Sequence, residues 1–335
     1  MYKKLPVLFF ILSLSLFMVI GCGDDDEPTK PDPINEFELL TEAGDVYVGN
    51  YTTPGGAGVN ISISAVFDNL TDGNTANDPY IIDYRAEADY NSGHLIGANR
   101  MGLTDLVAKI DDGTIPKDKT ILNVCYTGQT ASSATAFLNL IGYEAQNLLF
   151  GMCSVDTSIS GTDKWMNQVA TDEHAGDVVS TASTTTTTYD FPTLSTGGTT
   201  AEEVFKARFN EVIASSWPRI ASDNVWDNPG NYFIVNYWPA AEYTAPGHIP
   251  GAYQFTPKTS LLSDAQLGLL PTDKTIVVYC YTGQTSAQIC TYLTMLGYDA
   301  KSLLYGFNGF AYGLLAGHKY SGAPTPGIYD SILVK

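Results

Sequence analysis

Short apolar runs alternate with amphipathic stretches along most of the chain. The runs at 121–124 and 276–279 are rich in Ile, Leu and Val, which is typical of strands buried on both faces of a parallel sheet. Behind each run the apolar positions recur with a helical period, until Gly142 and Gly297 end the two predicted helices. This pattern predicts an α/β fold in which parallel strands alternate with helices.

Further elements follow from the same patterns. We expect helices over 36–48, 103–110 and 201–215, and strands over 80–83, 145–150 and 232–236. Thr200 followed three residues later by Glu203 is a capping-box arrangement that opens the helix at 201.

A seven-residue sequence occurs twice and divides the chain. It reads Cys-Tyr-Thr-Gly-Gln-Thr-Ala from Cys125 and Cys-Tyr-Thr-Gly-Gln-Thr-Ser from Cys280. Matching segments around the two copies are 153 to 155 residues apart, and so long a period indicates duplicated domains. We therefore predict one domain over 36–170, a Thr- and Gly-rich linker over 171–199, and a second domain over 200–335.

Composition narrows the classes of partner. Among 335 residues, 44% are apolar, and 36 acidic residues against 17 basic ones give a net charge of −19. A surface this acidic argues against nucleic acid and against docking on anionic lipid, and it gives no general attraction for anionic substrates. There is no Cys-x-x-Cys pair and no metal-like cluster of Cys and His, so we expect neither a metal nor a cofactor.

The first residues form a targeting segment. Lys3 and Lys4 precede an apolar stretch from Leu5 to Ile20, and Val19-Ile20-Gly21-Cys22 resembles the lipobox of bacterial lipoproteins. That resemblance implies a signal peptide over 1–21, a lipid on Cys22, an acidic and Pro-containing tether over 22–35, and a place in the bacterial cell envelope, in the periplasm or on the cell surface. A plain secretory signal or a short membrane anchor is the alternative.

Each repeated cysteine lies where a strand ends and a helix begins. Several backbone N–H groups point into such a loop, and the helix N-terminus adds partial positive charge. This environment is expected to lower the pKa of a cysteine and to suit a nucleophile or a holder of charged sulfur. The alternative is a buried cysteine beside an ordinary turn. Of the other cysteines, Cys290 is expected in the core, and the distance of Cys153 from Cys125 stays open.

The ordered set of motifs resembles the rhodanese (sulfurtransferase) domain. The first copy carries Asp83-Tyr84-Arg85, Gly93-His94-Leu95-Ile96-Gly97-Ala98, Cys125 and Gly142-Tyr143. The second carries Gly247-His248-Ile249-Pro250-Gly251-Ala252, Cys280 and Gly297-Tyr298. The resemblance implies two rhodanese-like domains, each a small parallel sheet flanked by helices, with His94 and His248 as structural residues.

The resemblance also implies the chemistry. A thiolate of Cys280 or Cys125 takes sulfur from thiosulfate, a persulfide or a polysulfide, holds it as a cysteine persulfide, and passes it to cyanide or a thiol. Gly128 and Gly283 are expected to allow close backbone approach to the sulfur. The substrate-binding loops implied by the resemblance are Tyr126, Thr127, Gly128, Gln129 and Thr130, and Tyr281, Thr282, Gly283, Gln284 and Thr285.

Two departures from the family pattern bear on this expectation. Thr130 and Thr285 stand where the family often has Arg, and a hydroxyl brings no charge to bind doubly charged thiosulfate. Asn236 and Trp238 replace the Asp-x-Arg pair in the second domain, and the resemblance implies that this pair, Asp83 and Arg85 in the first domain, is chiefly structural. We expect both loops to be competent, with Cys280 somewhat preferred. The alternatives are a non-enzymatic persulfide carrier or binding module on the same fold and, ranked below it, a phosphatase or arsenate reductase.

Overall fold

The computed structural model describes residues 34–335, except residues 160, 170–171, 216 and 323. The expected signal peptide, the lipidation site Cys22 and the tether up to residue 33 lie outside the described residues. No helix within the described ranges is both long enough and apolar enough to cross a membrane.

The first half of the chain forms a sheet of five parallel strands in the order β1-β6-β5-β2-β4. Its strands are β1 (Asn60–Ile61), β2 (Tyr80–Asp83), β4 (Asn99–Arg100), β5 (Ile121–Val124) and β6 (Ala145–Leu148). The central strand β5 is buried along its whole length, including the polar Asn123 among its apolar residues. The expected strand over 145–150 stops at Leu148, because Phe150 adopts a left-handed conformation with φ of 64°.

The second half repeats this arrangement. Its parallel sheet has the order β7-β11-β10-β8-β9, in which β10 holds the place of β5. The strands are β7 (Arg219–Ile220), β8 (Phe233–Asn236), β9 (Tyr253–Gln254), β10 (Ile276–Tyr279) and β11 (Ala300–Leu303). The predicted α/β class with two parallel sheets is confirmed. We call the two halves, each a sheet with its helices, the first and second modules.

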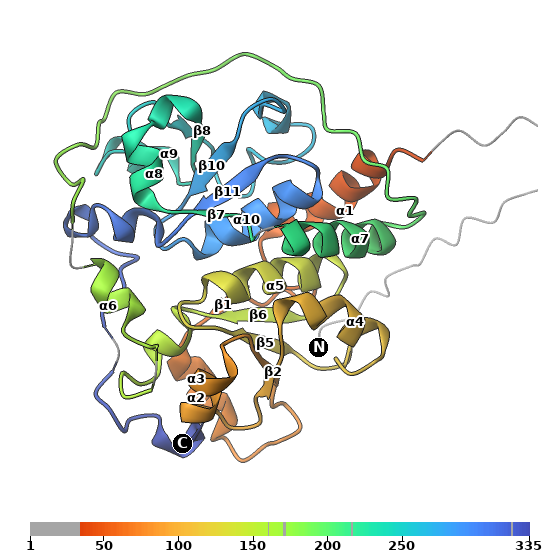
Figure 1. Ribbon diagram of the computed structural model, residues 1–335, viewed down its shortest axis with the longest axis vertical. Helices are drawn as coiled ribbons and strands as arrows, with labels where there is room; N and C mark the ends of the chain where they lie inside the picture. The colour runs from red at the N-terminus through yellow and green to blue at the C-terminus, as the bar shows by residue number, and fades with distance from the viewer. Residues whose placement is uncertain (1–33, 160, 170–171, 216, 323) are drawn as a thin grey trace, which may run out of the picture. The chain divides into compact units, whose positions relative to one another are not determined.

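Helices flank both sheets (Figure 1). Those of the first half are α1 (Glu36–Asn50), α2 (Ile63–Leu70), α3 (Glu87–Ser92), α4 (Leu106–Asp111), α5 (Gln129–Leu140) and α6 (Lys164–Val169). Those of the second half are α7 (Ala201–Ser215), α8 (Ser222–Asp227), α9 (Ala240–Thr244) and α10 (Gln284–Met295). At the start of α7, Glu203 N–H donates to Thr200 Oγ1 and Thr200 N–H donates to the Glu203 carboxylate, which confirms the capping box.

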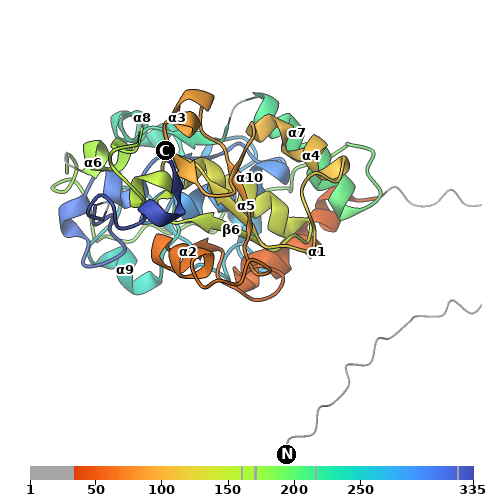
Figure 2. The same ribbon diagram turned by 90° about the horizontal axis from the view of Figure 1, so that it is seen from below.

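The helices that follow the two cysteine loops pack against each other between the sheets, as Figures 1 and 2 show. Both are buried along nearly their whole length. Hydroxyl groups join them: Thr291 Oγ1 lies 2.8 Å from Ser133 Oγ. One apolar cluster includes Phe137 of α5 and Leu293 of α10, so the two modules share a core.

Segments outside the sheets also join the halves. Helix α1 packs against α7, and the Glu36 carboxylate accepts hydrogen bonds from the backbone of Thr196 and Gly197. At the other end of the chain, β12 (Leu333–Val334) pairs antiparallel with β3 (His94–Leu95) of the first module. The contacts that tie the two modules together therefore include the α5–α10 packing, α1 and the last residues of the chain.

Candidate functional site

Both repeated cysteines lie directly after the central strand of a sheet. Cys125 follows β5 and Cys280 follows β10, at the carboxyl ends where parallel sheets bind ligands. Gly128 (φ 80°) and Gly283 (φ 76°) precede the first residue of α5 and α10, in a left-handed conformation that favours glycine. The strand–loop–helix geometry expected from the sequence is present twice.

The sulfur of Cys125 faces backbone amides. The N–H of Ala131 donates to Sγ at 3.4 Å, and Cys125 is only 2% exposed. Burial raises the pKa of the Cys125 thiol above its ordinary value, and the amides of Ala131, Thr127, Gly128 and Thr130 offset this only in part. The expected lowering of the pKa is therefore wrong for Cys125, because desolvation outweighs the amide contacts.

The sulfur of Cys280 has a polar contact that Cys125 lacks. The N–H of Ser286 lies 3.4 Å from Sγ, and the Ser286 hydroxyl lies 3.5 Å from it. That hydroxyl is also 2.8 Å from Ser302 Oγ. Position 286 is the single difference between the two seven-residue sequences, since alanine occupies position 131. The two sulfurs thus share an amide contact but differ in hydroxyl contact.

A tight turn after the neighbouring strand closes each loop. In the first module, Met152 N–H donates to Cys125 O at 2.9 Å and Cys153 N–H donates to Tyr126 O at 3.0 Å. In the second, Phe307 and Asn308 donate in the same way to Cys280 and Tyr281, both at 2.9 Å. The sequence analysis did not identify these turns, although Leu-Leu-Phe-Gly at 148–151 and Leu-Leu-Tyr-Gly at 303–306 repeat at the spacing of the cysteines.

The glycines that begin those turns pack directly on the cysteine loops. A Cβ atom on Gly151 would lie 2.6 Å from Gly128 N and 2.7 Å from Tyr126 O, and one on Gly306 would lie 2.7 Å from Gly283 N. Neither position has room for a side chain. The conformation of each cysteine loop therefore depends on the turn that lies against it.

The side-chain oxygens of the loop glutamines accept hydrogen bonds from the backbone of the opposite module. Gln129 Oε1 accepts a hydrogen bond from Tyr305 N–H at 2.8 Å, and Gln284 Oε1 accepts one from Phe150 N–H at 3.0 Å. Each contact crosses from one module to the other. The atom closest to a Cβ on Gly283 would be Gln129 Oε1 at 2.6 Å, and the one closest to a Cβ on Gly128 would be Gln284 Oε1 at 2.4 Å, so the opposite glutamine fills the space beside each loop glycine.

The loop tyrosines are tied to carboxylates. Tyr126 OH donates to Asp89 and accepts from Ala86 N–H at 3.1 Å, while Lys164 Nζ lies 4.7 Å from its ring centroid. These contacts direct the first loop tyrosine towards α3 at the edge of the site.

The second tyrosine repeats the arrangement with other partners. Tyr281 OH donates to Glu242, and its ring stacks between Trp238 and His318 at centroid distances of 4.5 and 4.3 Å. Trp238, which replaces the arginine of the first module, therefore supports the loop tyrosine by stacking instead of by charge.

The loop threonines have separate contacts. Thr127 Oγ1 accepts from Gln129 Nε2 at 3.1 Å, and Thr127 O accepts from Trp165 Nε1 at 3.1 Å. Thr282 is buried, whereas Thr130 and Thr285 are partly buried. Burial raises the pKa of Tyr51, which lies just beyond α1, and the neighbouring Thr285 side chain partly offsets this. Thr285 thus occupies the expected arginine position beside the phenol of Tyr51.

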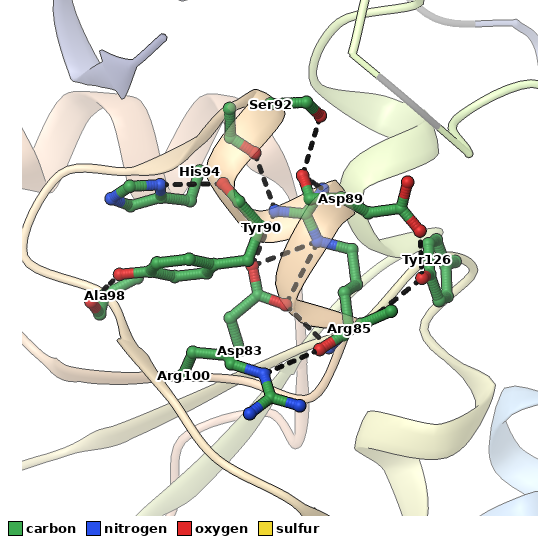
Figure 3. A network of polar contacts seen from close by, with 11 residues as sticks. Asp83, Arg85, Asp89, Tyr90, Ser92, His94, Ala98, Arg100 and Tyr126 are labelled. Carbon is green, nitrogen blue, oxygen red and sulfur yellow. Dashed lines mark hydrogen bonds and ion pairs between the residues drawn. The ribbon is translucent and has the colours of Figure 1, made fainter.

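The Asp83–Arg85 pair holds the backbone of the first module (Figure 3). The buried guanidinium binds both Asp83 oxygens and donates to the carbonyl groups of Asp89 and Gly93. In the second module, Asn236 Nδ2 donates to Tyr279 OH at 2.9 Å. The Arg85 guanidinium thus joins strand β2 to the backbone of α3 and of the turn after it, so the pair is structural, as its resemblance to the family motif implies.

The two motif histidines also hold turns. His94 Nδ1 lies 2.9 Å from Tyr90 O, and His248 Nδ1 lies 2.8 Å from Tyr243 O. Each imidazole stacks on the ring of the same tyrosine. His248 Nε2 also contacts the carbonyl of Thr181, so both ring nitrogens of His248 have backbone partners. The expected structural role fits this geometry.

The cysteines that the structure describes form no disulfide. Cys125, Cys153, Cys280 and Cys290 are free thiols, and Cys290 lies in the core as expected. Burial raises the pKa of Cys153 to about 11. In the part of the chain that the structure describes, no group of three or more His, Cys, Asp or Glu side chains is arranged to hold a metal ion.

Comparisons with known proteins point to one family. The family model described as Rhodanese-like domain matches residues 65–154 and again 222–312. No curated protein matches the chain.

Several solved structures are similar to parts of it. A thiosulfate sulfurtransferase from Pseudomonas aeruginosa is 15% identical, with 86% of this chain and 49% of that chain covered and a TM-score of 0.29. A rhodanese-like domain protein from Staphylococcus aureus is 20% identical over 28% of this chain and 86% of its own, with a TM-score of 0.24. A rhodanese-like domain from Anabaena is 25% identical over 28% and 70%, also with a TM-score of 0.24.

Proposed function

Because the chain belongs to the rhodanese-like domain family, we propose that it is a sulfurtransferase that moves sulfane sulfur from a donor to a thiophilic acceptor through a cysteine persulfide. The observation that carries this proposal is the placement of two cysteine sulfurs, each 3.4 Å from a helix-start N–H and each after the central strand of a parallel sheet. A sulfur in that position faces backbone donors that can stabilise negative charge on it during nucleophilic attack.

The reaction takes two steps. The cysteine thiolate attacks the outer sulfur of thiosulfate or of a persulfide, the donor S–S bond breaks, and sulfite or a thiolate leaves with the bonding electrons. The enzyme then holds Cys–S–S⁻. In the second step cyanide or an acceptor thiolate attacks the terminal sulfur, and the cysteine thiolate leaves to complete the cycle.

The loop amides give this chemistry its electrostatic support. The amides of Ala131, Thr127, Gly128 and Thr130 favour negative charge on Cys125, and α5 adds the partial positive charge of its N-terminus. Fixed backbone donors stabilise a developing anion without reorganisation. They supply less attraction for a doubly charged donor than an arginine would, so a persulfide or polysulfide is the donor that we expect to react faster than thiosulfate.

We assign the main transfer step to Cys280. Its sulfur has the Ser286 hydroxyl as an additional partner, and Ser302 in turn contacts that hydroxyl. When the thiol ionises, the Ser286 hydroxyl can rotate to donate to the thiolate. Cys125 has only amide contacts and a raised pKa, which supports the second candidate function, a non-enzymatic carrier or binding role, for the first module alone.

We also propose that the protein is anchored to a membrane of the bacterial cell envelope by a lipid on Cys22. The basic start, the apolar stretch and the sequence Val19-Ile20-Gly21-Cys22 support this proposal. Metabolic labelling with a fatty acid analogue tests it: label should be present on the full chain and lost in Cys22→Ala. Label that persists in Cys22→Ala would contradict the lipidation site.

The function is tested by turnover. The protein is incubated with cyanide and either a polysulfide or thiosulfate, and thiocyanate is measured. We expect activity that is lost in Cys280→Ser and mostly retained in Cys125→Ser, with thermal unfolding as the control for folding. Activity that persists when both cysteines are replaced, or no activity with any sulfane donor, would overturn the proposal.

A further inference from the structure

The two cysteine loops are joined by a reciprocal pair of hydrogen bonds. Gln129 is the first residue of α5 and Gln284 is the first residue of α10, and both side chains are buried, with 3% and 1% exposure. Gln284 Oε1 receives the N–H of Phe150, and Gln129 Oε1 receives the N–H of Tyr305. The backbone of each glutamine thus lies in one module, and its side-chain oxygen binds a backbone N–H of the other module.

The backbone N–H groups of Phe150 and Tyr305 need the glutamine oxygens as hydrogen-bond acceptors. Phe150 has φ of 64° and Tyr305 has φ of 62°, a left-handed conformation that costs free energy for residues with a Cβ. Each stands at the end of its strand, where the sheet no longer supplies a partner for its N–H. A partly buried N–H left without an acceptor is costly, and the opposite glutamine supplies the acceptor.

A short path leads from Gln284 to the sulfur of the other module. Phe150 is followed by Gly151, which packs on the backbone of the Cys125 loop. Met152 N–H then donates to Cys125 O at 2.9 Å. Gln284 therefore holds the turn that fixes the carbonyl of Cys125.

The mirror path runs from Gln129 to Cys280. Tyr305 is followed by Gly306, and Phe307 N–H donates to Cys280 O at 2.9 Å. The two paths use residues at matching positions of the repeat. The glutamines differ in their other contacts: Gln284 Oε1 also accepts from Asn147 Nδ2 at 3.0 Å, and Gln129 Nε2 donates to Thr127 Oγ1 at 3.1 Å.

We propose that Gln129 and Gln284 are positioning residues that act crosswise, so that Gln284 sets the loop geometry at Cys125 and Gln129 sets it at Cys280. The two sulfur sites then depend on each other through the module interface, and neither loop is complete without the other module. The consequence for sulfur transfer rests on the proposed function, whereas the consequence for thiol accessibility does not.

The proposal predicts that replacing a glutamine changes the reactivity of the cysteine in the opposite module, whereas a purely local packing role would change that of the cysteine in its own loop. Each glutamine is replaced by Met, which keeps the length of the side chain and removes the acceptor, and by Glu, which keeps an acceptor oxygen at a helix N-terminus. Both cysteines are alkylated with iodoacetamide at a fixed pH, and the rate at each is followed by mass analysis of its peptide. The ratio of the Cys125 rate to the Cys280 rate is the readout.

We expect Gln284→Met to free the turn over Cys125 and to raise this ratio about tenfold, which corresponds to ~1.4 kcal/mol of easier opening. Gln129→Met should lower the ratio by a similar factor. The Glu variants should return the ratio to within about threefold of the parent, ~0.7 kcal/mol on the same scale. Should Gln284→Met fail to fold, Gln284→Asn shortens the side chain by one carbon and withdraws the oxygen from Phe150 N–H. The same rise in the ratio is expected for it.

Two results would overturn the proposal. One is faster alkylation of the cysteine in the same loop as the replaced glutamine, and the other is a ratio that stays constant in both Met variants. Sulfur loading from a polysulfide is measured in parallel and should fall at the cysteine whose alkylation rises. If neither cysteine of the parent protein loads sulfur while the alkylation ratios move as stated, the sulfurtransferase proposal fails and the positioning role stands.

Discussion

Replacing Ser286 by alanine tests the difference in reactivity that we assign to the two cysteines. In the thiol form, Cys280 can donate to the Ser286 hydroxyl at 3.5 Å. In the thiolate form the direction must reverse, and the hydroxyl donates to sulfur while Ser302, at 2.8 Å, remains as its other partner. Ser286→Ala removes this hydroxyl and makes the second loop identical in sequence to the first.

The magnitude follows from the change in hydrogen-bond strength. A hydrogen bond to a charged group contributes roughly 1.5–3 kcal/mol and one between neutral groups about 0.5–1.5 kcal/mol. Loss of the hydroxyl should therefore cost the anionic sulfur about 1.4 kcal/mol more than the neutral one, which corresponds to at most about a tenfold slower reaction. A less stabilised anionic sulfur is intrinsically more nucleophilic, with a Brønsted slope of about 0.4–0.5, and this restores roughly threefold. The net expectation is about a threefold slower alkylation of Cys280.

The assay is alkylation of Cys280 at pH 7, followed by mass analysis of its peptide. Ala131→Ser in the first loop is the matched variant. It should accelerate Cys125 by less than threefold, because Asn147 stands where the second module has Ser302. An unchanged or faster rate at Cys280 in Ser286→Ala would refute the reasoning, since the hydroxyl would then not stabilise the thiolate.

Three further predictions concern the first module. Burial raises the pKa of Cys125, so the folded state favours its neutral thiol. The alkylation rate of Cys125 should therefore still rise with pH where the rate of a small-molecule thiol has already levelled off. A stopped-flow pH profile in which the Cys125 rate levels off at a lower pH than that of the small thiol would contradict this. Gly128→Ala places a Cβ at φ 80° within 2.9 Å of a buried carbonyl oxygen and should cost about 2–5 kcal/mol in the free energy of unfolding. The control Gly113→Ala, at φ 75° with nothing nearby, should cost only about 1–2 kcal/mol, and equal losses in urea titrations would argue against the close contact. Arg85→Met leaves the buried Asp83 carboxylate unpaired and should destabilise the protein by about 3–5 kcal/mol, whereas a loss under 1 kcal/mol by the same titration would mean that water reaches the pair.

The repeated pattern made much of the fold predictable. Short runs rich in Ile, Leu and Val, each followed by a glycine-containing turn and a helical period, are local signals, and they placed β5, β10, α5 and α10 correctly. The structural role expected for Asp83 and Arg85 also agrees with the backbone contacts of that pair. The expected domain boundaries and the roles of the individual loop residues stay predictions.

What the sequence could not reveal depends on contacts between distant residues. The crosswise glutamines meet partners more than 130 positions away, and no periodicity in one chain encodes such a pairing. The left-handed conformation of Phe150 and Tyr305 gave no signal, because neither residue type favours it. The direction of the Cys125 pKa was wrong for a related reason: the amides are local to the loop, whereas the burial that outweighs them comes from the whole module.

Mass analysis of the two cysteine peptides after incubation with a polysulfide tests the central claim most directly. The account predicts the added mass of one sulfur atom on the Cys280 peptide, removed by cyanide with the formation of thiocyanate, and a smaller degree of loading on Cys125. No added sulfur on either peptide, in protein whose thiols remain free, would contradict it.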